Sequence, residues 1–178
     1  CFLWTERHFC TAEHVPVRTA VNLSKHIKRV TEVYERAGFR VRTILMDGEF
    51  EKLKPLMPSV ECNTTAAKEH VSEAERTIRT LKERMRGLVA TLPFEWLPRR
   101  MKIEFIYFMV LWMNAFPMKS GISQTFLPRE LLLRWRLDYK KHCRVEPGTY
   151  CKVHDEPVPT NTMMPRTHEA IALGPTGN

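Results

Sequence analysis

An acidic residue stands where a predicted strand ends. Residues 44–50 read ILMDGEF, and Asp47 follows the mostly apolar run 41–46, which is typical of a strand covered on both faces. Ligands of α/β proteins gather at the carboxyl edge of the sheet, and Gly48 allows the chain to turn sharply away from the acid. Asp47 would therefore lie at the edge of the sheet where ligands bind. The alternative is that Asp47 caps a short helical turn that ends before Pro55.

A second acid begins a row of basic residues in the segment 68–86, KEHVSEAERTIRTLKERMR. Its apolar residues recur at helical spacing and form one stripe, and a different stripe holds an acid followed by cations: Glu75, Arg79, Lys82 and Arg86. This arrangement suits metal-dependent chemistry on a phosphate backbone, because the acid can hold a metal ion while the cations hold the polymer. The alternative is a solvated helix face with ordinary Glu–Arg pairs one turn apart.

The elements that would position these residues follow from the periodicity of the chain. Two strand pieces at residues 1–5 and 9–13 predict a hairpin, and the apolar spacing over 19–37 predicts a helix that Gly38 ends. The strand before Asp47 comes next. Further along, we expect a short edge strand at 60–62 and helices at 69–89 and 98–115. The order strand, strand, helix, strand predicts an α/β domain with a mixed sheet.

The composition of the chain changes after Pro117. Residues 128–136 predict a short helix, and residues 144–159 predict a β-hairpin around the dipeptide Pro147-Gly148. We place a boundary near residue 140, which divides the chain into a core over residues 1–140 and a small β-module over residues 141–178.

Charge and composition favour an anionic partner. The 178 residues carry a net charge of +8, with a pI near 9.4, which makes nucleic acid the first candidate. Five scattered cysteines without a CxxC pair favour a reducing compartment, and the spacing of His142, Cys143, Cys151 and His154 is poor for zinc. The longest apolar stretch, 105–116, is shorter than the roughly twenty residues of a membrane span, so we expect no membrane association. We also expect no secretion signal.

Several sequence blocks in their order resemble the integrase region of copia-type retrotransposon polyproteins. The blocks are LMDGEF, NTTAAKEHVSEAERTIRTLKERMR, WMNAFPMKSGIS, PRELLLRW and MMPRTHEAIALGPTGN. The resemblance implies a ribonuclease-H-like mixed sheet with flanking helices, followed by the start of a small β-barrel. It also implies a site in which two aspartates and a glutamate bind two Mg²⁺ or Mn²⁺ ions for DNA cutting and joining.

The resemblance assigns roles to individual residues of this chain. Asp47 corresponds to the second aspartate and Glu75 to the glutamate, so both are the expected metal-binding and catalytic acids. Arg79 and Lys82 match positions from which integrases contact DNA ends. On the same helix Arg76 and Arg86, with Lys68 at its entrance, complete the expected DNA-binding set.

The sequence departs from the family at two points. No acid occupies the family's first-aspartate position, so we expect a core truncated at its first strand and a β-module that stops before it is complete. Only 27 residues separate Asp47 from Glu75, whereas the family has about 35, and Glu83 satisfies the longer count. We favour Glu75, because the early turns of the helix should lie nearest the strand that carries Asp47.

The expected function follows from this comparison of residues. The parent protein would be a homo-oligomeric DNA strand transferase of the nucleus or of a cytoplasmic virus-like particle. The present chain would be an inactive fragment that still binds DNA. One alternative is a domesticated or decayed element protein that acts only as a DNA-binding module. Another is a plain ribonuclease-H-like nuclease with its missing acid elsewhere.

Overall fold

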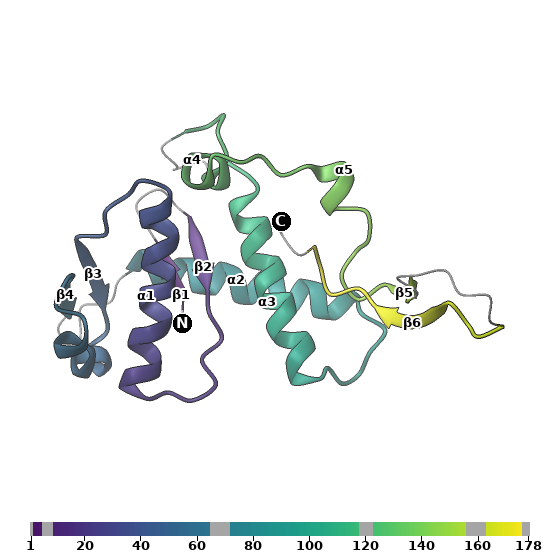
Figure 1. Ribbon diagram of the computed structural model, residues 1–178, viewed down its shortest axis with the longest axis horizontal. Helices are drawn as coiled ribbons and strands as arrows, with labels where there is room; N and C mark the ends of the chain where they lie inside the picture. The colour runs from purple at the N-terminus through teal and green to yellow at the C-terminus, as the bar shows by residue number, and fades with distance from the viewer. Residues whose placement is uncertain (1, 5–8, 65–71, 118–122, 156–162, 176–178) are drawn as a thin grey trace.

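The computed structural model describes residues 2–4, 9–64, 72–117, 123–155 and 163–175 (Figure 1). Its strands are β1 (Phe2–Trp4), β2 (Cys10–Ala12), β3 (Thr43–Met46), β4 (Glu61–Thr64), β5 (Tyr150–His154) and β6 (Thr167–Ile171). Its helices are α1 (Ala20–Arg36), the 3-10 helix η1 (Gly48–Leu56), α2 (Ser72–Thr91), α3 (Arg99–Asn114), α4 (Pro128–Leu133) and α5 (Tyr139–His142). The α/β class predicted from the sequence is confirmed, and α5 is an element that the sequence did not predict.

The strands of the described residues form three separate pairs. The pair β1–β2 is antiparallel, β3–β4 is parallel and β5–β6 is antiparallel. The predicted hairpin at the start of the chain is therefore confirmed, and its turn at residues 6–8 lies outside the described residues. In the described ranges, no ladder joins the first two pairs into the single mixed sheet that we expected.

The prediction that β3 is covered on both faces is wrong. Its residues alternate between exposed and buried, and Leu45 is 55% exposed. Ile44 and Met46 pack with Ile27 of α1 and Leu53 of η1, so these two helices cover one face of the strand. The other face of this two-stranded sheet lies open, so an apolar side chain there reaches solvent.

Helix α1 forms as its sequence predicts. The Thr19 hydroxyl accepts a hydrogen bond from the Asn22 amide at 3.2 Å, which caps the first turn. After the last turn Gly38 adopts a φ of 86°, a left-handed conformation that glycine enters without steric cost. One side of α1 packs on β3 and η1, and another packs through Val30 and Tyr34 against Phe9 and α4.

Helices α2 and α3 form a second core with strand β2. Leu81 of α2 contacts Met109 and Met113 of α3, and Cys10 of β2 packs into the same cluster. Phe105 is fully buried in an adjoining cluster at the other end of α3. Each large apolar side chain buried in this way contributes about 1.5–3 kcal/mol. Burial also raises the pKa of the Cys10 thiol to about 12, so this cysteine stays protonated at neutral pH.

The carboxyl-terminal strands pair differently from the prediction. The Pro147-Gly148 turn precedes β5 instead of joining two strands, and the connection between β5 and β6 spans 155–166. Gly148 has a φ of 89° and lies directly against the Leu92 side chain, where a β-carbon would collide. The turn therefore packs against Leu92, directly after the end of α2. Beyond β6, Leu173 packs against the cluster around Phe105.

Candidate nucleic-acid interface

Asp47 lies at the carboxyl end of β3 and its side chain is exposed. It occupies the N-cap position of η1, but its carboxylate makes no capping hydrogen bond, and only its carbonyl accepts a bond from the Phe50 amide at 2.9 Å. The helical turn also continues through Pro55 to Leu56, so the predicted end before Pro55 is wrong. Among the described residues, no side chain bonds to the Asp47 carboxylate, which leaves it accessible to a cation.

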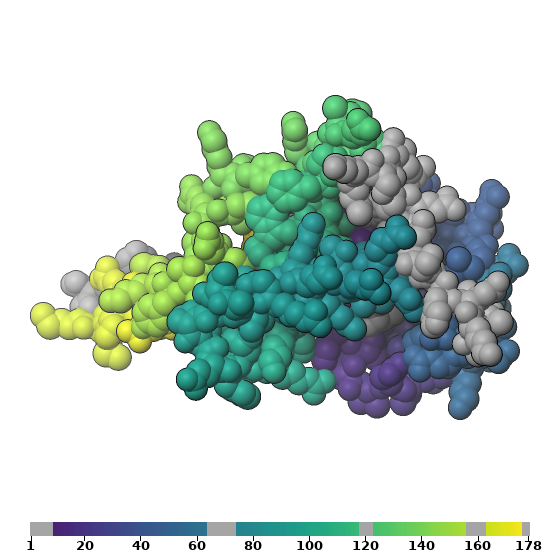
Figure 2. Space-filling view, turned by 180° about the vertical axis from the view of Figure 1, so that it is seen from behind, coloured from purple at the N-terminus to yellow at the C-terminus, as the bar shows by residue number. Residues whose placement is uncertain are grey.

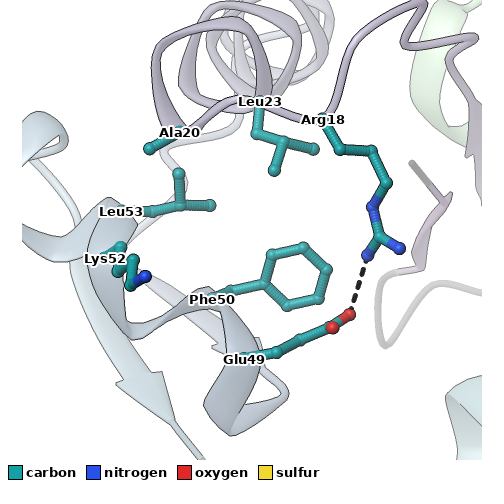
Figure 3. Close-up of a pocket in the computed structure, with 7 residues that line it drawn as sticks. All are labelled: Arg18, Ala20, Leu23, Glu49, Phe50, Lys52 and Leu53. Carbon is teal, nitrogen blue, oxygen red and sulfur yellow. Dashed lines mark hydrogen bonds and ion pairs between the residues drawn. The ribbon is translucent and has the colours of Figure 1, made fainter.

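A hollow of about 340 Å³ lies between the start of α1 and η1 (Figure 3). Its lining is Arg18, Ala20, Leu23, Glu49, Phe50, Lys52 and Leu53. Glu49 pairs with Arg18 at 2.9 Å, and both side chains are more than half exposed, so the pair contributes little to stability. A single paired carboxylate beside two cations does not favour a divalent metal ion, and Asp47 does not line this hollow.

Glu75 lies in the first turn of α2 and is exposed. Helix α2 begins on the side of the molecule that carries β3 and β4 and runs away from them, as the views from both sides show (Figures 1 and 2). The rival acid Glu83 is eight residues further along the same helix, a displacement of about 12 Å. Of these two glutamates, Glu75 is therefore the one nearer to the β3 side of the molecule.

The cations of α2 lie away from its apolar side. Leu81 is buried, and Met85 and Leu88 pack partly buried against the core that α2 shares with α3. The predicted DNA-binding residues of this helix are all exposed, and we call them the α2 basic face: Arg76, Arg79, Lys82 and Arg86. The predicted separation of an apolar and a basic stripe is confirmed. Figure 2 shows α2 lying across the face of the molecule seen from behind.

Arg79 and Glu83 lie one turn apart, but no ion pair joins them in the described part of α2. Exposed side chains gain little from such a pair, because water screens the charges and the pairing costs rotamer freedom. The guanidinium of Arg79 thus remains available to an anion. Lys68, the cation predicted at the entrance of the helix, lies outside the described residues.

Metal coordination needs more ligands than these two acids supply. A divalent ion such as Mg²⁺ takes about six oxygen ligands, several of them from water or phosphate. Within the described ranges, no three histidines, cysteines or acids gather into a metal-binding group. Asp47 and Glu75 offer the hard oxygen donors that Mg²⁺ or Mn²⁺ prefers, and their sharing of an ion stays a prediction.

Arg84 and the segment 134–144 hold basic residues outside the predicted DNA-binding set. Arg84, on the flank of α2, lies near enough to Cys10 to oppose the effect of burial on the pKa of that thiol. The segment 134–144, RWRLDYKKHCR, carries five Arg or Lys residues against one acid, a net charge of +4 in eleven residues. A running count of charge along the chain would have found this segment.

Comparisons of the chain with protein-family models, curated proteins and solved structures find no match. The geometry of the molecule must therefore carry any functional conclusion. In the described ranges, no helix has both the length and the apolar composition needed to cross a membrane.

Proposed function

We propose that this chain is a DNA-binding protein of the retrotransposon-integrase type. The observation that carries the proposal is the α2 basic face, with four exposed cations along a helix whose other side is anchored in the core. A rigid helix that presents cations at one-turn intervals can contact successive phosphates without reading the bases. The net charge of +8 adds long-range attraction to a polyanion.

The acids support the integrase assignment through their chemistry. Asp47 follows a strand, and no side chain in the described ranges bonds to its carboxylate; Glu75 lies near the start of the basic helix. These two residues would hold Mg²⁺ or Mn²⁺, and a pair of such ions in the parent enzyme would activate the attacking oxygen and stabilise the leaving one. The α2 basic face would then position the phosphate backbone beside the acids.

We also propose that residues 1–140 form a ribonuclease-H-like core. In the described residues, the edge of β3 away from β4 pairs with no strand, and β1 likewise pairs only with β2. One strand between β1 and β3 would join the two pairs into a mixed sheet. In the proposed parent this strand would also carry the first aspartate.

A second candidate is a DNA-binding module without metal chemistry. The basic face supports this function equally, because phosphate contacts need no metal ion. Retention or loss of Mn²⁺ binding by Asp47 and Glu75 distinguishes the two candidates.

Substitution of Arg79 and Lys82 tests the DNA-binding proposal. The double variant Arg79→Ala/Lys82→Ala should bind duplex DNA more weakly, irrespective of base sequence. Log affinity falls with log salt by about 0.9 per phosphate contacted, so the slope should decrease in magnitude by about 1.8. Fluorescence anisotropy of a labelled duplex across a salt series measures both quantities.

The matched control is Lys25→Ala/Lys28→Ala on α1. These lysines are exposed, and α1 lies in front of α2 in Figure 1, on the other side of the molecule. Both double variants remove two charges, so a general charge effect would weaken binding equally. Equal salt slopes for the α1 variant, the α2 variant and the parent chain would disprove the assignment of DNA binding to α2.

A further inference from the structure

A row of aromatic rings emerges at the end of α3 and continues onto α5. Phe108, Trp112 and Phe116 follow at intervals of four residues, so they lie along one stripe. The Trp112 and Phe116 rings are stacked, with centroids 5.3 Å apart and planes within 8°. The Tyr139 ring lies 6.5 Å beyond Phe116 at a tilt of 30°. We call Trp112, Phe116 and Tyr139 the aromatic platform.

The platform is both exposed and held in position. Phe116 is 49% exposed and Tyr139 is 40% exposed. The Tyr139 hydroxyl donates a hydrogen bond to the carbonyl of buried Ala115 at 2.9 Å, which ties α5 to the end of α3. The Asp138 carboxylate accepts bonds from the amides of Lys140 and Lys141 and so fixes the turn that carries Tyr139. These bonds hold the Tyr139 ring beside Phe116 at the end of α3.

Exposed cations follow the platform in the chain. Lys140 and Lys141 follow Tyr139 in the chain, Arg144 comes one turn later, and all three side chains are exposed. Among the described residues, none of the three forms an ion pair, and Arg144 instead donates to the Lys140 carbonyl at 3.1 Å. A partner of this surface must therefore offer negative charge together with flat apolar faces.

We propose that the aromatic platform binds unpaired nucleotides of a single-stranded nucleic acid. Bases stack on the Phe116 and Tyr139 rings, and the neighbouring cations bind the backbone phosphates. A continuous duplex keeps its base faces inside the helix, so it can use the cations but not the rings. The site lies apart from the α2 basic face and does not depend on the integrase assignment.

Three ligands of one length test the proposal: oligo(dT), a matched duplex and an abasic deoxyribose-phosphate strand. Phe116→Ala should weaken oligo(dT) binding by about 5- to 150-fold, because stacking of one base on an aromatic ring accounts for such a factor. Duplex and abasic strand should bind the variant within about twofold of the parent. Anisotropy with labelled ligands gives the three affinities, and circular dichroism melting verifies that the variant is folded.

Three further variants provide the controls. Phe126→Ala removes an exposed phenyl ring outside the platform and should leave oligo(dT) binding within about twofold. Tyr139→Phe keeps the ring and should retain most of the affinity, whereas Tyr139→Ala should not. Lys140→Ala/Lys141→Ala should weaken all three ligands and lower the single-strand salt slope by about 1.4 in magnitude.

Two results would overturn the proposal. One is an equal loss of oligo(dT) and abasic-strand binding in Phe116→Ala, because the rings would then contribute nothing specific to bases. The other is self-association of the chain through the platform. In that case Phe116→Ala would sediment more slowly than the parent chain while its affinity for oligo(dT) stayed the same. Neither result depends on the α2 variants, so the two binding sites succeed or fail separately.

Discussion

At the scale of single residues, Asn114 joins two segments that are far apart in the sequence. Its side-chain amide donates to the Cys10 carbonyl at 2.7 Å and its amide oxygen accepts from the Cys10 amide at 2.8 Å. Both residues are buried. The side chain thus lies at the edge of β2 as a neighbouring strand would, and it forms hydrogen bonds with one buried donor and one buried acceptor of the Cys10 backbone.

We expect Asn114→Ala to lower the free energy of unfolding by about 2–4 kcal/mol, because it removes two hydrogen bonds to buried backbone groups of Cys10. Chemical denaturation followed by circular dichroism measures this loss. The control is Asn22→Ala, which removes a longer, exposed bond of 3.3 Å to the Val17 carbonyl and should change the stability by less than about 1 kcal/mol. Equal effects of the two substitutions would show that the Cys10 backbone finds other partners.

At the scale of elements, α2 sets the spacing between charged groups. It is one continuous helix from Ser72 to Thr91, so its 1.5 Å rise and 100° rotation per residue fix where each side chain lies along it. Glu83 lies about 12 Å beyond Glu75 and about 80° round the helix. Two metal ions of a phosphoryl-transfer site lie about 4 Å apart, so these glutamates cannot belong to the same site.

We expect Glu75→Gln to weaken Mn²⁺ binding about tenfold or more. Loss of a residue that only hydrogen-bonds to a metal ligand already lowers metal affinity by about tenfold, and loss of the ligand itself should lower it further. Asp47→Asn should have the same effect, and Glu83→Gln should leave the affinity unchanged. Titration followed by electron paramagnetic resonance of free Mn²⁺ measures the three variants. A loss with Glu83→Gln but not with Glu75→Gln would reverse the assignment of the metal-binding acid.

At the scale of the whole molecule, basic residues occur on several elements. The α2 basic face and the segment 134–144 lie on different parts of the chain, and the described acids do not gather into a group of three. Such a distribution of exposed cations favours binding of a polyanion, whereas catalysis by two metal ions requires several carboxylates at one point.

We therefore expect the purified chain to bind DNA but neither to cleave nor to join it with Mg²⁺ or Mn²⁺. A labelled duplex with the sequence of an element end, resolved on a denaturing gel after prolonged incubation, provides the measurement. Turnover that disappears in Asp47→Asn would contradict this expectation, since it would show that the chain completes a catalytic metal site by itself.

Local patterns predicted the helices well. The apolar spacing, Thr19 and Gly38 gave α1 within one residue of its observed ends, and the prolines gave the bounds of α3. The division of α2 into apolar and basic sides was predicted for the same reason: helical periodicity is a property of neighbouring residues. The positions of Asp47 after a strand and Glu75 on a helix were likewise determined by the sequence.

Tertiary structure decided which neighbours each element has. The sequence 44–46 is apolar throughout, yet Leu45 is exposed, because the number of layers around β3 depends on contacts with distant segments. The Pro147-Gly148 turn packs on Leu92, although its composition is that of a hairpin loop. Phe116 stacks on Trp112 only four residues away, but its approach to Tyr139 required α5 to return to the end of α3. Long-range packing, which no local pattern encodes, therefore completed the aromatic platform.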